Sequence, residues 1–233
     1  IQIFGGGTHA GRRVDIQDFM VVAPGAENID EALEWTAEIY LAAGKLMAER
    51  GLLYGVADEG GYWPAFSTNE EALEMLLRAI EKTKLVPNEQ VAISLDIAAS
   101  EFGNGGQYKI GLEKKQLDSD GLIDMLGRWL DKYPIVSIED PLAEDDEAGL
   151  KKFTAAFGAR GQIVGDDYLA TSAEATSPKN RSSSRWAASS AGRPIGSVLR
   201  GVPGNLGGRA SRGEFAHDLD PDARADAVGP GVD

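Results

Sequence analysis

The chain has 233 residues, of which 42% are hydrophobic, and a formal net charge of -14. This balance suits a soluble protein of one large or two small domains and argues against nucleic acid as a partner, since phosphate binding needs clustered Lys and Arg. There are no cysteines, which excludes disulfides and thiolate metal sites, and no apolar run approaches the ~18 residues of a membrane span. With no recognisable signal peptide, we expect a cytoplasmic protein whose natural start precedes Ile1.

Strand and helix signals alternate along the first part of the chain. The apolar runs that predict strands lie, in chain order, at residues 14–24, 90–102, 134–140 and 162–167. The segments with helical periodicity lie at residues 28–51, 67–85, 118–133 and 144–157. Asn28 and Glu31 form a capping box at the first helix, and Ser67 or Thr68 is suited to cap the second. Strands that alternate with helices favour an α/β fold with a parallel sheet or barrel.

The composition changes near Ser172. Residues 172–233 are rich in Ser, Gly, Pro, Ala and Arg, and no period of 2 or 3.6 is sustained there. All of the net negative charge precedes this point, and arginine replaces lysine as the main base after it. Such a segment cannot bury enough apolar surface to offset its ordering entropy. We therefore expect a folded domain at residues 1–171. For residues 172–233 we expect an irregular, low-complexity tail that is either disordered or, as the abrupt change favours, translated out of frame.

Three of the predicted strands end in an acid: Asp96, Glu139 and Asp166. Taken singly, such an acid is more often a helix cap or a loop residue. In a (β/α)₈ barrel, however, side chains at the carboxyl ends of strands converge on one mouth, where the active site lies. Three carboxylates gathered there would repel one another without a cation, and oxygen-only ligation suits Mg²⁺ or Mn²⁺. The repeated pattern therefore favours a metal site, with Asp140 as a supporting residue behind it.

Several long motifs, taken together, resemble one family. The segments GGGTHA, IQDFMVVAPGA, ADEGGYWP, SLDIAASEF, YPIVSIEDPLAEDD and QIVGDDYLATS stand in enolase order and at enolase-like spacing. The resemblance covers residues 1 to about 172. It implies a partial enolase-type (β/α)₈ TIM barrel, with about five of eight strands, followed by the irregular tail. It also implies an enolase-like lyase of glycolysis, which interconverts 2-phospho-D-glycerate and phosphoenolpyruvate. Members of this family commonly form homo-oligomers.

The resemblance also implies roles for particular residues. Asp96, Glu139 and Asp166 match the Mg²⁺ ligands, and Glu59 matches the proton donor that helps hydroxide leave. His9 and Gln17 match residues that line the pocket for a small phosphorylated substrate. Asp18 stands where the family usually has Glu, so its carboxyl group lies on a shorter side chain next to the leaving group.

The chain departs from the family pattern in other places. Gly5 replaces the usual Asn of the first motif, and Ala57 replaces a Gly before the Asp-Glu pair. The base lysine that enolases carry on a later strand is not recognisable, and Lys179 in SPKNRSSS does not stand in a buried strand. We therefore expect this chain to be inactive. Two alternatives stay open: another dehydratase or racemase of the enolase superfamily, and a non-catalytic binding or scaffold protein that retains the fold.

Overall fold

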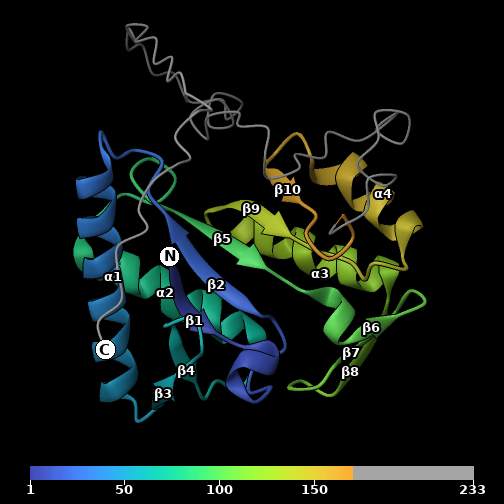
Figure 1. The fold of residues 1–233 in the computed structure, drawn as a ribbon, viewed down its shortest axis with the longest axis horizontal. Helices are drawn as coiled ribbons and strands as arrows, with labels where there is room; N and C mark the ends of the chain where they lie inside the picture. The colour runs from blue at the N-terminus through green and yellow to red at the C-terminus, as the bar shows by residue number, and fades with distance from the viewer. Residues whose placement is uncertain (170–233) are drawn as a thin grey trace, which may run out of the picture. The chain divides into compact units, whose positions relative to one another are not determined.

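The computed structural model describes residues 1–169 (Figure 1), so the expected tail and Lys179 lie outside the described residues. The larger sheet has the strand order β10-β9-β5-β2-β1-β4-β3. Its strands are β1 (Gln2–Gly5), β2 (Asp18–Val22), β3 (Leu53–Val56), β4 (Tyr62–Pro64), β5 (Ala92–Asp96), β9 (Ile135–Glu139) and β10 (Gln162–Val164). A second sheet contains β6 (Gly103–Asn104), β7 (Gln107–Ile110) and β8 (Lys115–Asp118). The α/β class is confirmed, and the larger sheet is open at β10 and β3 within the described part.

The direction of β2 differs from the parallel arrangement that the sequence predicted. Strands β5, β9 and β10 are parallel to one another, whereas β2 is antiparallel to both β1 and β5. The physical reason is the connection between β1 and β2. It contains only the short 3-10 helix η1 (Gly7–Ala10), and a parallel pair would need a crossover of a dozen or more residues. The start of β2 therefore lies at the same edge of the sheet as the ends of β5 and β9.

The helices begin where the capping residues predicted. They are α1 (Ile29–Glu49), α2 (Asn69–Thr83), α3 (Ser119–Lys132) and α4 (Glu147–Phe157), with a short 3-10 helix η2 (Ala99–Glu101). The Asn28 side chain accepts the N–H of Glu31 at 2.9 Å, and the Glu31 carboxylate accepts the N–H of Glu27 at 2.7 Å. Thr68, rather than Ser67, caps α2. Each cap satisfies a backbone donor that the first helical turn leaves free.

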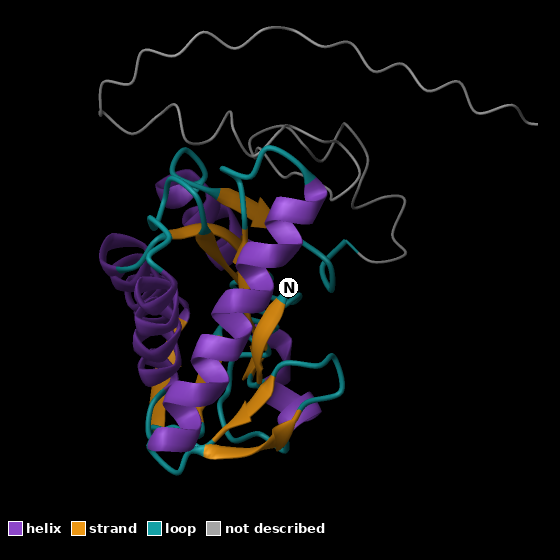
Figure 2. Cartoon of the chain, turned by 90° about the vertical axis from the view of Figure 1, so that its left-hand side faces the viewer, coloured by secondary structure: helices purple, strands orange, loops and turns teal. Residues whose placement is uncertain are grey.

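The helices cover the outer side of the sheet. Helices α2 and α3 lie behind the strands in Figure 1, and the long helix α1 runs alongside them in the side view of Figure 2. Their apolar residues join those of the strands in one core that includes Phe19, Leu76, Leu95, Leu126 and Phe153. No helix within residues 1–169 is both long enough and apolar enough to cross a membrane.

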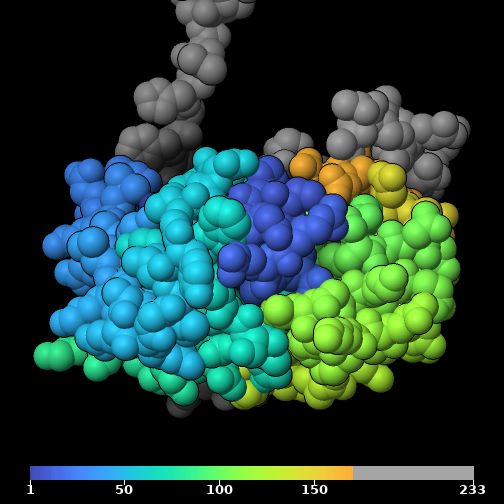
Figure 3. Space-filling model, turned by 90° about the horizontal axis from the view of Figure 1, so that it is seen from below, coloured from blue at the N-terminus to red at the C-terminus, as the bar shows by residue number. Residues whose placement is uncertain are grey.

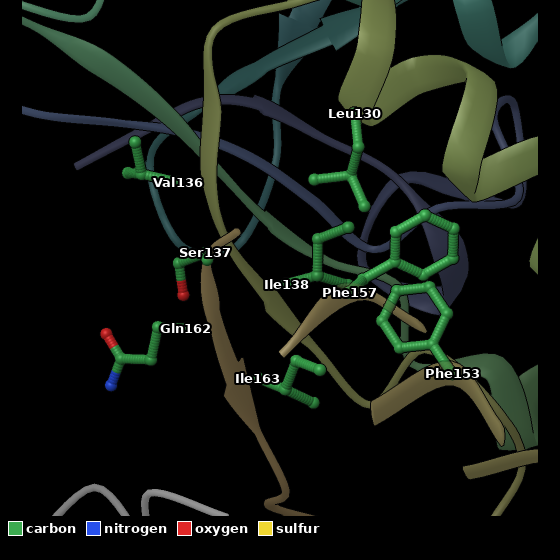
Figure 4. Close-up of a pocket in the computed structure, with 9 residues that line it drawn as sticks. Leu130, Val136, Ser137, Ile138, Phe153, Phe157, Gln162 and Ile163 are labelled. Carbon is green, nitrogen blue, oxygen red and sulfur yellow. The ribbon is translucent and has the colours of Figure 1, made fainter. Parts of the chain in front are cut away.

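Side chains alternate between the two faces of the strands, which decides what faces the inside of the partial barrel. On β9 and β10, Ile138 and Ile163 point toward Phe153 and Phe157 of α4, while Ser137 and Gln162 point the other way (Figure 4). The apolar side leaves a void of about 10 Å³, which is close to the minimum for one water molecule. The opposite face carries Ser137 and Gln162 and leads to Glu139 at the end of β9.

Candidate active site at the strand ends

Three acids occupy equivalent positions on three neighbouring strands. Asp18 of β2 lies opposite Asp96 of β5, and Asp96 lies opposite Glu139 of β9. Neighbouring strands are about 4.8 Å apart, and residues in one register project from the same face. We call these three residues the acidic layer. Asp96 and Glu139 end their strands, whereas Asp18 begins β2, because β2 runs antiparallel to β5.

Burial and mutual repulsion change the acidity of this layer. Burial, followed by the charge of Glu139, raises the pKa of Asp96 to about 8. Burial, followed by the charge of Asp140 and then of Asp166, raises the pKa of Glu139 to about 7. The pKa of Asp18 is also raised by burial, against the hydrogen bond that it accepts from Gln2. Buried carboxylates of one sign disfavour their own ionisation, so this layer favours positive charge or retained protons.

The donor chemistry of these side chains fits a hard divalent cation, but residues 1–169 do not gather them into a closed metal site. Asp166 lies just beyond β10, whose Val164 is paired with Glu139. Its charge contributes to the raised pKa of Glu139, after burial and the charge of Asp140. Within residues 1–169, no group of three or more Asp, Glu or His side chains is arranged so that it could hold one metal ion. Asp96, Glu139 and Asp166 thus share one end of the sheet without converging on one point.

Hydrogen bonds hold the residues around the acidic layer. Gln17, which directly precedes β2, donates from Nε2 to Asp96 Oδ2 at 2.9 Å. The carboxylate of Asp96 also accepts the N–H of Ala98 at 3.0 Å. The buried Asp140 accepts the backbone N–H groups of Asp166 and Asp167, at 3.1 and 2.8 Å. Asp140 therefore fixes the backbone that carries Asp166, which fits the supporting position expected for it.

The expected proton donor lies on a different part of the rim. Glu59 is exposed in the turn between β3 and β4. The side chain of Gln2 connects it to the acidic layer, because Gln2 Nε2 donates to Asp18 Oδ1 and lies 3.4 Å from Glu59 Oε2. His9, on η1, has its Nδ1 3.7 Å from Asp58 Oδ2, in the same turn as Glu59. The structure therefore brings His9, Asp18 and Glu59 to one region of the sheet edge.

A carboxylate on η2 holds the segment that carries His9. Glu101 accepts the N–H of Thr8 at 3.1 Å and its hydroxyl at 2.6 Å. A Cβ on Gly7, whose φ is 52°, would approach Glu101 Oε2 to 2.8 Å, so this contact depends on glycine. Figure 3 shows the resulting rim, where the blue N-terminal segment lies between the cyan surface near residues 50–65 and the green surface near residues 100–118.

Sequence reasoning overlooked Gln2 and Glu101. Gln2 precedes the first glycine-rich motif and lies 59 residues from Gly61, whose N–H its Oε1 accepts at 2.7 Å. Neither its polarity nor its position in a short apolar run indicates that contact. For Glu101, the only signal was its place five residues after Asp96, close to the end of a strand.

A barrel segment with an acidic layer at its strand ends is typical of metal-dependent enzymes that act at the barrel mouth. The family described as "Enolase, C-terminal TIM barrel domain" matches residues 1–183. An enolase of Rubrobacter xylanophilus is 48% identical over 169 residues, which cover 72% of this chain and 39% of that relative. The chain belongs to the enolase family. It matches 39% of the length of that curated relative.

Proposed function

We propose that this chain carries the metal-binding and proton-donating part of an active site that dehydrates 2-phospho-D-glycerate to phosphoenolpyruvate in the cytoplasm. In that reaction a base removes the proton from C2, and the hydroxyl group leaves C3 as water after it accepts a proton. The observation that carries the proposal is the register of Asp18, Asp96 and Glu139 on three adjacent strands. The enolase motifs and the family match support the choice of substrate.

Asp96, Glu139 and Asp166 would hold Mg²⁺ in this proposal, which requires their carboxylates to converge when the ion binds. Bound there, Mg²⁺ would supply the positive charge that makes removal of a proton next to a carboxylate accessible. Gln17 keeps one carboxylate oxygen of Asp96 oriented. Asp140 holds the backbone of Asp166 in place. A cation would also relieve the repulsion that raises the pKa of Glu139 and Asp96.

Glu59 would carry the proton for the leaving hydroxyl group, with Asp18 beside it. The exposed position of Glu59 gives it access to a substrate at the rim, and Gln2 connects it to Asp18. His9, on the segment held by Glu101, would contact the substrate from the same side. A carboxylic acid can deliver a proton to a leaving oxygen when it lies within hydrogen-bonding reach of it.

The residues that would complete catalysis are not recognisable in this chain. The expected base lysine has no counterpart in residues 1–169, and Lys179 lies outside the described residues. We therefore propose that the chain binds Mg²⁺ weakly and does not convert 2-phospho-D-glycerate to phosphoenolpyruvate. The rival assignment to another dehydratase of the superfamily is disfavoured by the DEGG and GGGTHA segments. A non-catalytic scaffold would retain the sheet without requiring Mg²⁺ binding at Glu139.

The metal assignment predicts a Mg²⁺-dependent rise in melting temperature that Glu139→Gln removes. Binding to the folded state alone stabilises it by mass action, and the substitution takes one carboxylate ligand away. The melting temperature of parent and variant would be followed by circular dichroism at increasing Mg²⁺ concentrations.

Glu144→Gln is the matched control, because Glu144 is exposed and lies outside the acidic layer. It removes the same charge and should keep the parent's response to Mg²⁺. The metal assignment fails if Glu139→Gln responds to Mg²⁺ as strongly as the parent chain does.

The chain should form no measurable phosphoenolpyruvate from 2-phospho-D-glycerate in the presence of Mg²⁺. Loss of one positioned proton-transfer group typically costs about 10²–10⁴-fold in rate, and the phosphate-binding groups of the family are not recognisable here either. Absorbance of phosphoenolpyruvate would be recorded beside an active full-length enolase. Turnover by the chain would show that another residue acts as the base.

A further inference from the structure

We propose that Gln2 is a positioning residue, which places the Glu59 carboxylate beside Asp18 through a single buried amide. The inference rests on the proposed function in so far as Glu59 is the proton donor there. Gln2 begins β1 and is only 7% exposed. It makes three polar contacts, and they connect β1, β2 and the turn between β3 and β4.

The three contacts fix which way the amide faces. The N–H of Gly61 can only donate, and it points at Oε1 of Gln2, at 2.7 Å. The side-chain oxygen of Gln2 must therefore face Gly61, so its NH₂ group faces the carboxylates of Asp18 and Glu59. An NH₂ group has two hydrogens, and each can serve one of the two acids. The buried carboxylate of Asp18 is costly without such a donor.

The strand register shows why Gln2 can reach both acids. Gln2 lies opposite Met20, two residues further along β2 than Asp18, and so projects from the same face of the sheet. Its side chain reaches from the level of Met20 to the level of Asp18 in the acidic layer. A shorter side chain at the same position would leave the amide below Asp18.

Two glycines leave space for this amide. A Cβ on Gly61 would approach Gln2 Oε1 to 2.5 Å, whereas a Cβ on Gly5 would meet the Ala57 Cβ at 2.4 Å and Gln2 Nε2 at 3.2 Å. The first contact is too short for any side chain. Gly61 therefore serves the position of Gln2 as well as the turn itself, and Gly5, where the family usually has Asn, lies against the same amide.

The contacts can be tested on the chain itself by NMR, without metal or substrate. The side-chain NH₂ of Gln2 should exchange with solvent at least about tenfold more slowly than that of the exposed Gln116, because buried hydrogen-bonded amides open rarely. Exchange of the Gln2 side chain at the rate of Gln116 would overturn the proposal, whatever any variant does.

Two substitutions separate the role of the Gln2 side chain as a hydrogen-bond acceptor from its role as a donor. Gln2→Met keeps the length of the side chain and loses both roles, so the Gly61 N–H should exchange about two- to twelvefold faster, as loss of one hydrogen bond implies. Gln2→Glu keeps an acceptor for Gly61 but puts a carboxylate against Asp18 and Glu59. Gly61 should then stay protected, while the carboxyl carbon resonance of Glu59 moves in both variants.

Gln90→Met is the control, since Gln90 accepts the N–H of Val86 in a turn away from the site. It should leave the Gly61 and Glu59 signals unchanged. If Gln2→Met folds and both signals match those of the parent, Gln2 does not position Glu59. These readouts are independent of Mg²⁺. A missing Mg²⁺ response with intact Gln2 signals would therefore refute the proposed function alone.

Discussion

The carboxylate of Asp96 illustrates how a binding residue can weaken its own fold. It lies between Asp18 and Glu139 in the acidic layer, and its burial raises its pKa to about 8. One hydrogen bond from Gln17 and one from the N–H of Ala98 support it. These donors do not remove the repulsion from its neighbours. We propose that Asp96 is retained for the ion it would bind rather than for the stability it gives.

Replacing Asp96 by Asn should therefore stabilise the chain in the absence of metal. The amide is neutral at every pH, so it avoids the cost of a buried carboxyl group whose pKa is raised to about 8, and it can donate to Glu139. We expect the free energy of unfolding to rise by about 0.5–2 kcal/mol, which is the common gain when a destabilising functional group is removed. Urea unfolding in chelator would measure it. Asp124→Asn, on the exposed surface of α3, should change stability little, and a loss of stability in Asp96→Asn would contradict the argument.

At the scale of elements, Asp146 connects three parts of the fold. Its carboxylate caps α4 through the N–H of Gly149 at 2.9 Å and accepts the Ser119 hydroxyl of α3 at 2.5 Å. It also accepts the hydroxyl of Tyr108, a fully buried residue of β7, at 2.8 Å. Burial acts to raise the pKa of Asp146, but the hydrogen bonds from Ser119, Gly149 and Tyr108 outweigh it, and the pKa is lowered.

Asp146→Ala should cost roughly 2–3 kcal/mol, because the cap is lost and the buried hydroxyl of Tyr108 loses its acceptor. Since the folded-state pKa lies below the ordinary value of 3.8, the contribution of the carboxylate is complete above that pH. It is lost as the pH falls through the lowered pKa. The stability gap between variant and parent should therefore narrow in strong acid.

The exposed neighbour Asp145 provides the control for this element. Among residues 1–169 it accepts only from the Asn104 side chain and the N–H of Gly105, so Asp145→Ala should cost less than Asp146→Ala. Chemical denaturation of both variants at neutral pH and near pH 2.5 would measure the difference. Equal losses at both residues would mean that Asp146 is not the junction described.

The sequence predicted the elements whose own residues carry a local signal. The capping residues Asn28 and Thr68 located two helix starts, and apolar runs located β2, β5, β9 and β10. It overlooked β1, β3 and β4, which are short, and the β6-β7-β8 sheet, whose strands are largely polar. The direction of β2 could not be predicted, because alternation of side chains is the same in parallel and antiparallel strands.

The residues of the candidate site also differ in whether the sequence could predict them. The acids at the ends of β5 and β9 could be found, since a strand signal ends directly in a carboxylate. Gln2 could not, because its contacts with Asp18, Glu59 and Gly61 span 16, 57 and 59 residues. The roles of Glu59, His9 and Gln17 came from resemblance, and they stay predictions until substrate or metal binding is measured.

At the scale of the whole molecule, composition and charge divide the chain near residue 171. The strongly acidic part coincides with the described fold, and the family match extends to residue 183. We propose that residues 1–171 contain all of the stabilising interactions of the folded domain. This boundary follows from composition, since a Ser-, Gly- and Pro-rich segment has little apolar surface to contribute.

A chain that ends at Thr171 should accordingly unfold at the same midpoint as the full chain. Thermal unfolding monitored by circular dichroism would compare the two, with a chain that ends at Lys132 as the control. The control lacks β9, α4 and β10 and should not unfold cooperatively, because it loses the strand that pairs with β5. A lower midpoint for the chain that ends at Thr171 would show that later residues contribute to the core.

The antiparallel pairing of β2 on both sides limits where residues can be inserted into or deleted from this part of the chain. β2 is hydrogen-bonded on both sides, with Asp18 opposite Gly5 on one neighbour and Asp96 on the other. A one-residue insertion inside β2 would exchange the two faces, and would turn Phe19 into the barrel and Asp18 into the apolar layer. The exposed turn at residues 11–13 has no such double constraint. Natural insertions and deletions near this site should therefore accumulate in that turn, while the strand keeps its length.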